Sequence, residues 1–266
     1  MIKLFRHIRQ RLLNQSKTSQ YLAYGIGEIL LVVIGILIAL GINNWNQTHE
    51  NRKAEQQILA QLEKEYESNL QQLESKIYIR EQVIESSFKI LAYRKLPMAQ
   101  VNADSFNLYL SRVITRPTFD PISGVSEELK SSGKLYLITN DQLRSEIAAF
   151  ESFLSELHEE EQVTLNHVEN IFIPFIIEHY QIGKVMAEFM DDDDFTANFT
   201  LATGKKYSGI GDLFDQVDFE PILHNPDFED QAALMINNCI YTNQQSLGVK
   251  QKMDSTLAII RAELKP

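Results

Sequence analysis

Residues 21–42 read YLAYGIGEILLVVIGILIALGI, and the interpretation of the whole chain starts from this stretch. It holds 22 residues and a single charged side chain, Glu28. At a rise of about 1.5 Å per residue, a helix of this length spans roughly 33 Å and can cross a hydrocarbon core of about 30 Å. A core helix of a soluble protein rarely stays apolar on every face over such a length. The sequence therefore predicts a transmembrane helix over residues 21–42.

Aromatic residues flank the apolar stretch. Tyr21 and Tyr24 stand at one end and Trp45 follows the other, as in the aromatic belts of membrane–water interfaces. A cleaved signal peptide has a shorter apolar region, about 7–15 residues, followed by small residues at the cleavage site. Residues 41–45, GINNW, offer no such site. We therefore expect an uncleaved signal anchor.

The charges of the chain are divided unevenly about this helix. The whole chain has a net charge of −11 and a mean hydropathy of −0.21, the averages of an ordinary acidic soluble protein. The first 20 residues, however, hold five cations and no acid, and Glu28 adds one negative charge, which leaves −15 for residues 29–266. By the positive-inside rule, the basic end stays in the cytoplasm. We expect residues 1–20 to be cytoplasmic and residues 46–266 to lie outside the cytoplasm.

Residues 2–13, IKLFRHIRQRLL, form a basic amphipathic pattern. Apolar residues recur on one helical face, whereas most cations, including Arg6, Arg9 and Arg11, lie elsewhere. Such a helix is suited to lie on an anionic lipid leaflet. The same cations also suffice to set the topology alone, and the residues favour neither role over the other. Membrane lipid is the first partner that the sequence predicts.

Small residues recur on one face of the predicted membrane helix. The face is formed by Gly27, Leu31, Gly35 and Ala39, and Glu28 borders it. The spacing of Gly35 and Ala39 is the small-xxx-small pattern that allows two helices to approach closely. We predict that this face supports self-association or docking on a partner membrane helix, with Glu28 bonded across the contact. The alternatives are an interfacial carboxylate beside incidental glycines, and an ion-conducting ring of Glu28.

Beyond the membrane helix, apolar residues recur at spacings of three, four or seven, as in helices. A first long helix over residues 46–93 has a stripe typical of a core or a coiled coil. A short helix capped by Asp104 and another that ends at Gly133 follow. A second long helix begins at Asn140 or Asp141 and ends or kinks at Pro174. The apolar residues assigned to the first stripe are Leu59, Leu62, Tyr66, Leu70, Leu73, Ile77, Ile84, Phe88 and Leu91.

A final helix over residues 227–264 completes an all-α bundle. Its predicted apolar face comprises Leu234, Ile240, Tyr241, Leu247, Met253, Leu257, Ile260 and Leu264. Alternation in residues 195–201, FTANFTL, allows one small β-hairpin. The predicted organisation is a cytoplasmic segment (1–20), a transmembrane helix (21–42), a long helix or stalk (43–97) and a helical domain packed with the stalk (98–266).

No residue pattern points to catalysis, a cofactor or a metal. Four aspartates at residues 191–194 lack the alternation of a calcium loop, so a solvated acidic loop is favoured. His158 has no second ligand in an H-E-x-x-H pattern, and residues 204–211 lack the order of a phosphate loop and indicate a basic turn. The single cysteine, Cys239, is expected to be buried and inert. The acidic composition argues against nucleic-acid binding.

A dense pattern surrounds the membrane helix: MIKLFR at residues 1–6, the apolar residues 21–40 and INNWN at residues 42–46. It continues more loosely through residues 126–135, SEELKSSGKL, and the pair at 143–144. This pattern resembles an abundant family from Bacteroidota that is known only as a domain of unknown function. The resemblance implies a Gram-negative inner membrane and a periplasmic, leucine-rich helical region, and it carries over no catalytic residue.

The expected function is that of an interaction protein and not of an enzyme. We predict a single-pass inner-membrane anchor that presents a helical periplasmic domain and either self-associates or docks on another inner-membrane protein. A periplasmic ligand-sensing module that signals through a partner is one alternative, because helical bundles can hold ligands between helices. An oligomeric channel that uses Glu28 is the other.

Overall fold

The computed structural model describes residues 18–199 and 209–264, which are helical apart from turns and connecting segments. This confirms the predicted all-α fold. The chain divides into two compact units, residues 1–55 and residues 56–266. Helix α2 (Thr18–Tyr93) supplies residues to both. The amphipathic helix predicted near the N-terminus lies outside the described residues.

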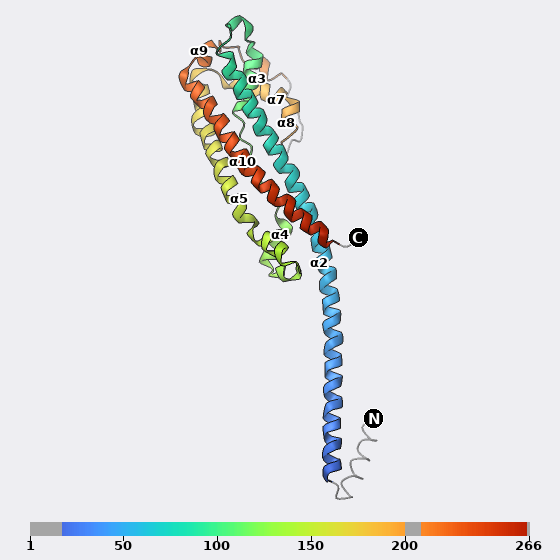
Figure 1. The fold of residues 1–266 in the computed structure, drawn as a ribbon. Helices are drawn as coiled ribbons and strands as arrows, with labels where there is room; N and C mark the ends of the chain where they lie inside the picture. The colour runs from blue at the N-terminus through green and yellow to red at the C-terminus, as the bar shows by residue number, and fades with distance from the viewer. Residues whose placement is uncertain (1–17, 200–208, 265–266) are drawn as a thin grey trace. The chain divides into compact units, whose positions relative to one another are not determined.

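Three long helical segments form the body of the second unit. They are the C-terminal part of α2, α5 (Asp141–His167) and α10 (Pro226–Glu263), which lie side by side in Figure 1. Ion pairs join Lys250 to Glu74 and Arg261 to Glu63. Because the later residue of α10 pairs with the earlier residue of α2, these two helices run antiparallel.

Shorter helical elements connect the long ones. They are η1 (Met98–Gln100), α3 (Ala103–Val113), α4 (Gly124–Ser131), η2 (Lys134–Leu137), α6 (Ile173–His179), α7 (Ile182–Asp191), α8 (Asp193–Thr196), η4 (Gly211–Leu213) and α9 (Glu220–Leu223). The predicted cap of α3 at Asp104 is wrong by two residues. Asn102 is the cap, because its side chain accepts a hydrogen bond from the Ser105 N–H at 3.0 Å.

Pro174 marks a change of helix type. Helix α5 passes into a π-helical turn, η3 (Val168–Phe172), and then into α6. Pro174 has no N–H to bond to the carbonyl four residues earlier. We attribute the π turn to this loss, since a wider helical turn relieves the mismatch without ending the helix. The predicted end or kink thus takes the form of a local π turn.

The predicted hairpin is replaced by a helical turn in the described residues. Residues 193–196 form α8, and no strand occurs in the ranges 18–199 and 209–264. The rings of Phe189, Phe195 and Phe199 contact one another edge to face, with centroids 5.7 to 6.2 Å apart. The alternation of Phe195 and Phe199 therefore reflects an aromatic cluster and not the pleat of a strand.

Two clusters of buried apolar side chains stabilise the second unit. The first lies between α2, α5 and the C-terminal half of α10 and includes Leu62, Phe150 and Met253. The second includes Phe228 and Cys239 and joins α10 to the shorter helices. Burial raises the pKa of the Cys239 thiol to about 12, so the thiol stays neutral at physiological pH. The predicted burial of Cys239 is confirmed.

The buried stripe of α2 differs from the predicted one beyond Tyr66. Glu65, Ile79 and Ser86 are buried beside a heptad seam of buried positions at spacings of three and four: Leu59, Leu62, Tyr66, Asn69, Leu73, Lys76, Arg80, Val83, Ser87 and Ile90. The predicted positions Leu70, Ile77 and Ile84 lie beside this heptad seam and are only partly buried, and Phe88 is 56% exposed. Apolar spacing did not predict these buried positions, because polar side chains occupy the seam where they bond to the main chain.

The last helix departs from prediction in its N-terminal half. Met253, Leu257 and Ile260 are buried as expected. Four other residues of the predicted apolar face are exposed: Leu234, Ile240, Tyr241 and Leu247. The buried face of this half combines Phe228 and Met235 with smaller or more polar residues, which are Ala232, Cys239, Thr242 and Ser246.

Candidate functional site

The predicted packing residues of the membrane helix lie on an exposed face of α2 in the first unit. The most apolar 18-residue window of α2 has a mean hydropathy of 2.6, and none of it is buried. The helix is therefore long and apolar enough to span a membrane. Leu31 is 69% exposed, and a Cβ added at Gly27 or Gly35 would meet no described atom within 4 Å beyond its own helix. Ala39 is likewise exposed.

The residues that flank this face are only partly described. Glu28 is exposed beside Gly27, and Trp45 is 72% exposed with its ring stacked on His49 at 6.3 Å between centroids. The remaining predicted interface residues lie outside the described side chains: Arg6, Arg9, Arg11, Tyr21 and Tyr24. The structure therefore places Gly27, Leu31, Gly35 and Ala39 along one exposed helix, and both their packing role and the lipid contacts stay predictions.

In the second unit, amide side chains of α2 bind the main chain of residues 117–126. Asn69 accepts a hydrogen bond from the Ile122 N–H at 2.8 Å and donates to the Ile122 carbonyl at 2.7 Å. Gln72 makes the same two contacts with Asp120, at 2.9 and 3.0 Å. Each amide satisfies both main-chain groups of one residue, much as a neighbouring strand would. The polar positions in and beside the seam of α2 thus hold residues 117–123, which have no regular structure of their own and lead into α4.

Glu65 of α2 caps the helix that follows this segment. The side chain of Ser123, at the N-cap of α4, makes no capping bond. Glu65 accepts hydrogen bonds instead from the Val125 N–H at 2.7 Å, the Ser126 N–H at 3.3 Å and the Ser126 hydroxyl. A carboxylate in this place satisfies N–H groups that have no partner within the helix, and the helix dipole stabilises its charge.

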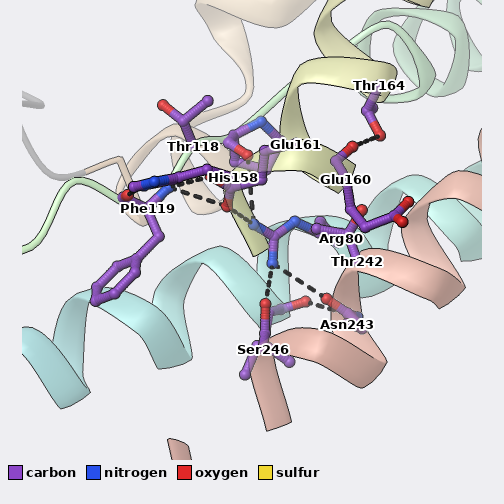
Figure 2. A network of polar contacts seen from close by, with 12 residues as sticks. Arg80, Thr118, Phe119, His158, Glu160, Glu161, Thr164, Thr242, Asn243 and Ser246 are labelled. Carbon is purple, nitrogen blue, oxygen red and sulfur yellow. Dashed lines mark hydrogen bonds and ion pairs between the residues drawn. The ribbon is translucent and has the colours of Figure 1, made fainter. Parts of the chain in front are cut away.

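Arg80 of α2 and Glu161 of α5 form a buried ion pair at the far end of the same segment (Figure 2). Their side chains are 2% and 1% exposed. The two Glu161 oxygens accept from the Phe119 N–H at 3.0 and 3.1 Å. Arg80 donates to the Ser246 hydroxyl of α10 at 2.9 Å and to the Pro117 carbonyl at 3.4 Å. The pair therefore joins the three long helices to residues 117–126.

Burial dominates the ionisation of both partners. Desolvation raises the pKa of Glu161 and lowers that of Arg80, and the attraction between them opposes each shift. In buried ion pairs generally, the cost of removing both charges from water can exceed the attraction between them. We infer that the pair serves to position the segment more than to stabilise the fold.

His158, the candidate metal ligand, lies at the same place. Its Nε2 is 3.2 Å from the Phe119 carbonyl, so the imidazole is a further contact to the segment (Figure 2). Within the described ranges, no three or more His, Cys, Asp or Glu side chains are grouped so that they could hold a metal ion.

The four aspartates do not form the solvated loop that the sequence favoured. Asp191 ends α7, whereas Asp193 and Asp194 begin α8. Asp192 is buried and accepts two hydrogen bonds from Arg112, at 2.6 and 2.9 Å. This fork-shaped contact attaches the junction of α7 and α8 to α3. Both oxygens of the buried carboxylate are therefore engaged by a side chain of the protein.

A hollow of about 390 Å³ lies between α3, the end of α5 with its π turn, and α7. Its apolar lining is Ile114, Leu165, Met186, Phe189 and Phe199, and its polar lining is Ser111, Thr115, Thr118, Arg116 and Glu169. Arg116 and Glu169 form an ion pair. The volume is within the range of small-molecule sites, which combine apolar walls with a few polar groups. Because its residues come from distant parts of the chain, sequence reasoning had no signal for it.

His167, at the end of α5, is expected to make stability depend on pH. Its side chain is buried, its Nε2 lacks a hydrogen-bond partner in the described structure, and its ring lies 6.0 Å from that of Phe172. Burial lowers the pKa of His167 below its ordinary value of about 6.5. The unfolded chain therefore takes up the proton more readily. The stability from neutral His167 is present above about pH 6.5 and is lost as the pH falls through the folded pKa.

Replacing His167 with glutamine should flatten this dependence. From pH 7.5 to 5.5, the free energy of unfolding of the native chain should fall more steeply than that of His167→Gln, by up to about 1.4 kcal/mol per pH unit for one proton. Urea titrations of the full chain in detergent at several pH values measure the slopes. The exposed His224 provides the control, since His224→Gln should keep the native slope. Equal slopes for all three proteins would contradict the prediction.

Comparison with known proteins adds one match. No curated protein and no solved structure matches the chain. The matched stretch is residues 28–153, which include Leu31, Gly35 and Ala39 of the packing face, the polar residues of α2 from Glu65 to Arg80 and the segment that they hold. Residues 28–153 match the model of a family of unknown function (DUF6090), and this match confirms the resemblance to a family known only as a domain of unknown function.

Proposed function

We propose that this protein is a single-pass inner-membrane anchor whose helical outer domain, residues 56–266, works in an assembly with copies of itself or with another membrane protein. The unpartnered small-residue face of α2 carries the proposal. Gly27 and Gly35 have open space where a side chain would stand, on a helix apolar enough to span a membrane. In lipid, such a face allows close packing of a second helix.

The charge distribution supports a cytoplasmic N-terminus and a periplasmic outer domain. Five cations precede the membrane helix, and they are best placed against the anionic cytoplasmic leaflet. The outer domain carries −15 and is repelled by anionic lipid. It can therefore stand away from the membrane surface and meet another protein.

Two measurements on the full chain test the proposal. Reporter fusions at both termini should place the N-terminus in the cytoplasm and the C-terminus in the periplasm. Chemical crosslinking in native membranes, followed by mass spectrometry, should capture a second copy or a defined membrane partner. A periplasmic N-terminus would overturn the orientation. A chain that stays monomeric both in native membranes and in mild detergent would overturn the assembly.

A ligand-sensing role is the second candidate, and the hollow of about 390 Å³ beside the π turn favours it. Its mixed lining suits a small molecule with an apolar body and a neutral polar group, because Arg116 and Glu169 already neutralise each other. Thermal-shift measurements on the full chain against a panel of small metabolites test this role. No shift with any class of compound would count against it. The channel alternative stays a prediction that ion-flux measurements on Glu28→Gln would test.

A further inference from the structure

The N-terminal half of α10 exposes a face without charge. Residues 231–249, QAALMINNCIYTNQQSLGV, contain no Asp, Glu, Lys or Arg, although the domain around them carries −15. Four large apolar side chains of this stretch are 41–55% exposed: Leu234, Ile240, Tyr241 and Leu247. Together with exposed Ala233, Asn237 and Gln244, they define the α10 face.

The exposed residues of the α10 face follow a heptad. Ala233, Ile240 and Leu247 are seven residues apart, and the polar residues between them continue the alternation of four and three. These intervening positions are Asn237, Gln244 and Gln251, all exposed. In a seam between two helices, two positions of each heptad make the contact, and here one of them is apolar and the second is polar. The buried face of the same helix already packs on α2 and α5, so this second seam has no partner within the described structure.

A second copy of this chain is the partner that the charges favour. Two outer domains that approach each other bring −15 against −15, and like-charged surfaces repel. A contact through an uncharged face keeps the carboxylates of the two copies apart. A basic partner, in contrast, would gain more from the acidic surfaces elsewhere on the domain.

The amide side chains of the α10 face suit a symmetric contact. Asn237 and Gln244 each carry a donor and an acceptor group, so the same residue of a second copy can satisfy both. A twofold contact has this requirement, because one patch must be complementary to itself. A charged side chain at either position would instead face its own like charge.

The exposed apolar residues of α5 lack this combination. On α5, Phe153 and Val163 are exposed, but the exposed carboxylates Glu156 and Glu159 stand between them. Phe153 is also covered by the Lys252 ammonium group, 4.9 Å from its ring centroid. The combination of exposed apolar residues, amides and no charge is found on the α10 face.

We propose that the outer domains of two copies pair through the α10 face. This inference rests on the proposed function in one respect, the anchoring of copies in a common membrane. Confinement raises the effective concentration of the copies, so a contact of modest area suffices to hold two domains together.

Disulfide crosslinking of the full chain in native membranes tests the pairing. Gln244→Cys places a thiol within the α10 face and should give a disulfide-linked dimer under mild oxidation. Ser155→Cys, at an exposed position of α5, should stay monomeric. The native Cys239 can remain, because its thiol is fully buried. The unmodified chain shows how much disulfide-linked dimer Cys239 alone gives.

Charged substitutions test whether the face itself holds the dimer. In the Gln244→Cys chain, Ile240→Glu should lower the crosslinked yield about tenfold, since it opposes two unpaired carboxylates across the contact. Val163→Glu makes a comparable apolar-to-acid change on α5 and should leave the yield unchanged. Both sites are exposed, and circular dichroism confirms that each variant retains its helices. If Ile240→Glu does not lower the yield of disulfide-linked dimer in the Gln244→Cys chain, the inference is wrong.

A thiol in the membrane helix separates this inference from the proposed function. Leu31→Cys reports association through the small-residue face of α2. Dimers at residue 31 without dimers at residue 244 would overturn pairing through the α10 face and leave the proposed assembly standing. Monomers at both positions in native membranes would overturn the α10 pairing together with self-association through α2, and would leave docking on another membrane protein as the proposed form of assembly.

Discussion

Replacing Arg80 with methionine should lower the free energy of unfolding of the outer domain by about 3–5 kcal/mol. The reason is that Glu161 stays buried, with a side chain only 1% exposed, and loses its partner charge. Arg80→Met also removes the donors to the Ser246 hydroxyl and the Pro117 carbonyl. Each polar group left without a partner in the interior adds to the loss. Urea unfolding of the full chain in detergent, followed by circular dichroism, measures the change.

The double variant Arg80→Met with Glu161→Gln should recover a large part of this loss. It contains no buried charge, and the glutamine oxygen can still accept from the Phe119 N–H, as Glu161 does at 3.0 Å. Removing both charges also removes the cost of burying them, which the attraction within a buried ion pair often does not offset. A double-mutant cycle gives the coupling free energy of the two sites.

An exposed ion pair provides the matched control. Arg261 pairs with Glu63 and Glu67 on the surface between α10 and α2, and solvent screens these charges. Arg261→Met should therefore change stability much less than Arg80→Met. If Arg80→Met were as stable as the native chain, or if the double variant were no more stable than Arg80→Met, the stated role of the pair would be wrong.

The effect of Arg80→Met should also be measurable directly in residues 117–126. Hydrogen exchange should accelerate at the Phe119 N–H in Arg80→Met, because its acceptor Glu161 is no longer fixed by the guanidinium. The Val125 N–H, held by Glu65, should change less. This difference would separate local release of residues 117–126 from a general loss of stability.

The long helices could be predicted from the sequence because their signals are local. Apolar spacing, the cap at Asn140 and the effect of Pro174 all act within a few residues. The residues of the small-residue face of α2 also lie within a few turns of one helix. These features depend on the order of neighbouring residues, and reading the chain in order is sufficient to find them.

The polar seam could not be predicted because its partners lie far away in the chain. Glu65 caps a helix that begins about 60 residues later, and Arg80 meets Glu161 from another long helix. A pattern of hydrophobicity assigns such residues to the surface, and it places Leu70 or Ile77 in the core instead. The same bias placed Ile240 and Leu247 in the core, although the structure exposes both. Burial of polar side chains depends on tertiary partners that spacing alone does not reveal.

Replacing Gly35 with isoleucine should weaken association of the full chain through α2 by about tenfold or more. A Cβ at Gly35 would meet no described atom within 4 Å, so the larger side chain has room within its own chain. Its cost arises only when a second helix approaches the face closely. Isoleucine is also apolar, and the helix keeps its capacity to span a membrane. The loss should therefore report an intermolecular contact and not a damaged fold.

Gly41 offers the matched control, because it lies on the same apolar helix about half a turn away from the line of Gly35 and Ala39. A Cβ there also has open space, so Gly41→Ile makes the same chemical change away from the close-packing pair of Gly35 and Ala39. Energy transfer between labelled full chains in lipid vesicles measures association. Using the Ile240→Glu background prevents pairing through the α10 face from masking the effect. If Gly35→Ile and Gly41→Ile weaken association equally, helix packing does not depend specifically on the Gly35 and Ala39 pair, and the small-xxx-small pattern no longer supports the proposed function.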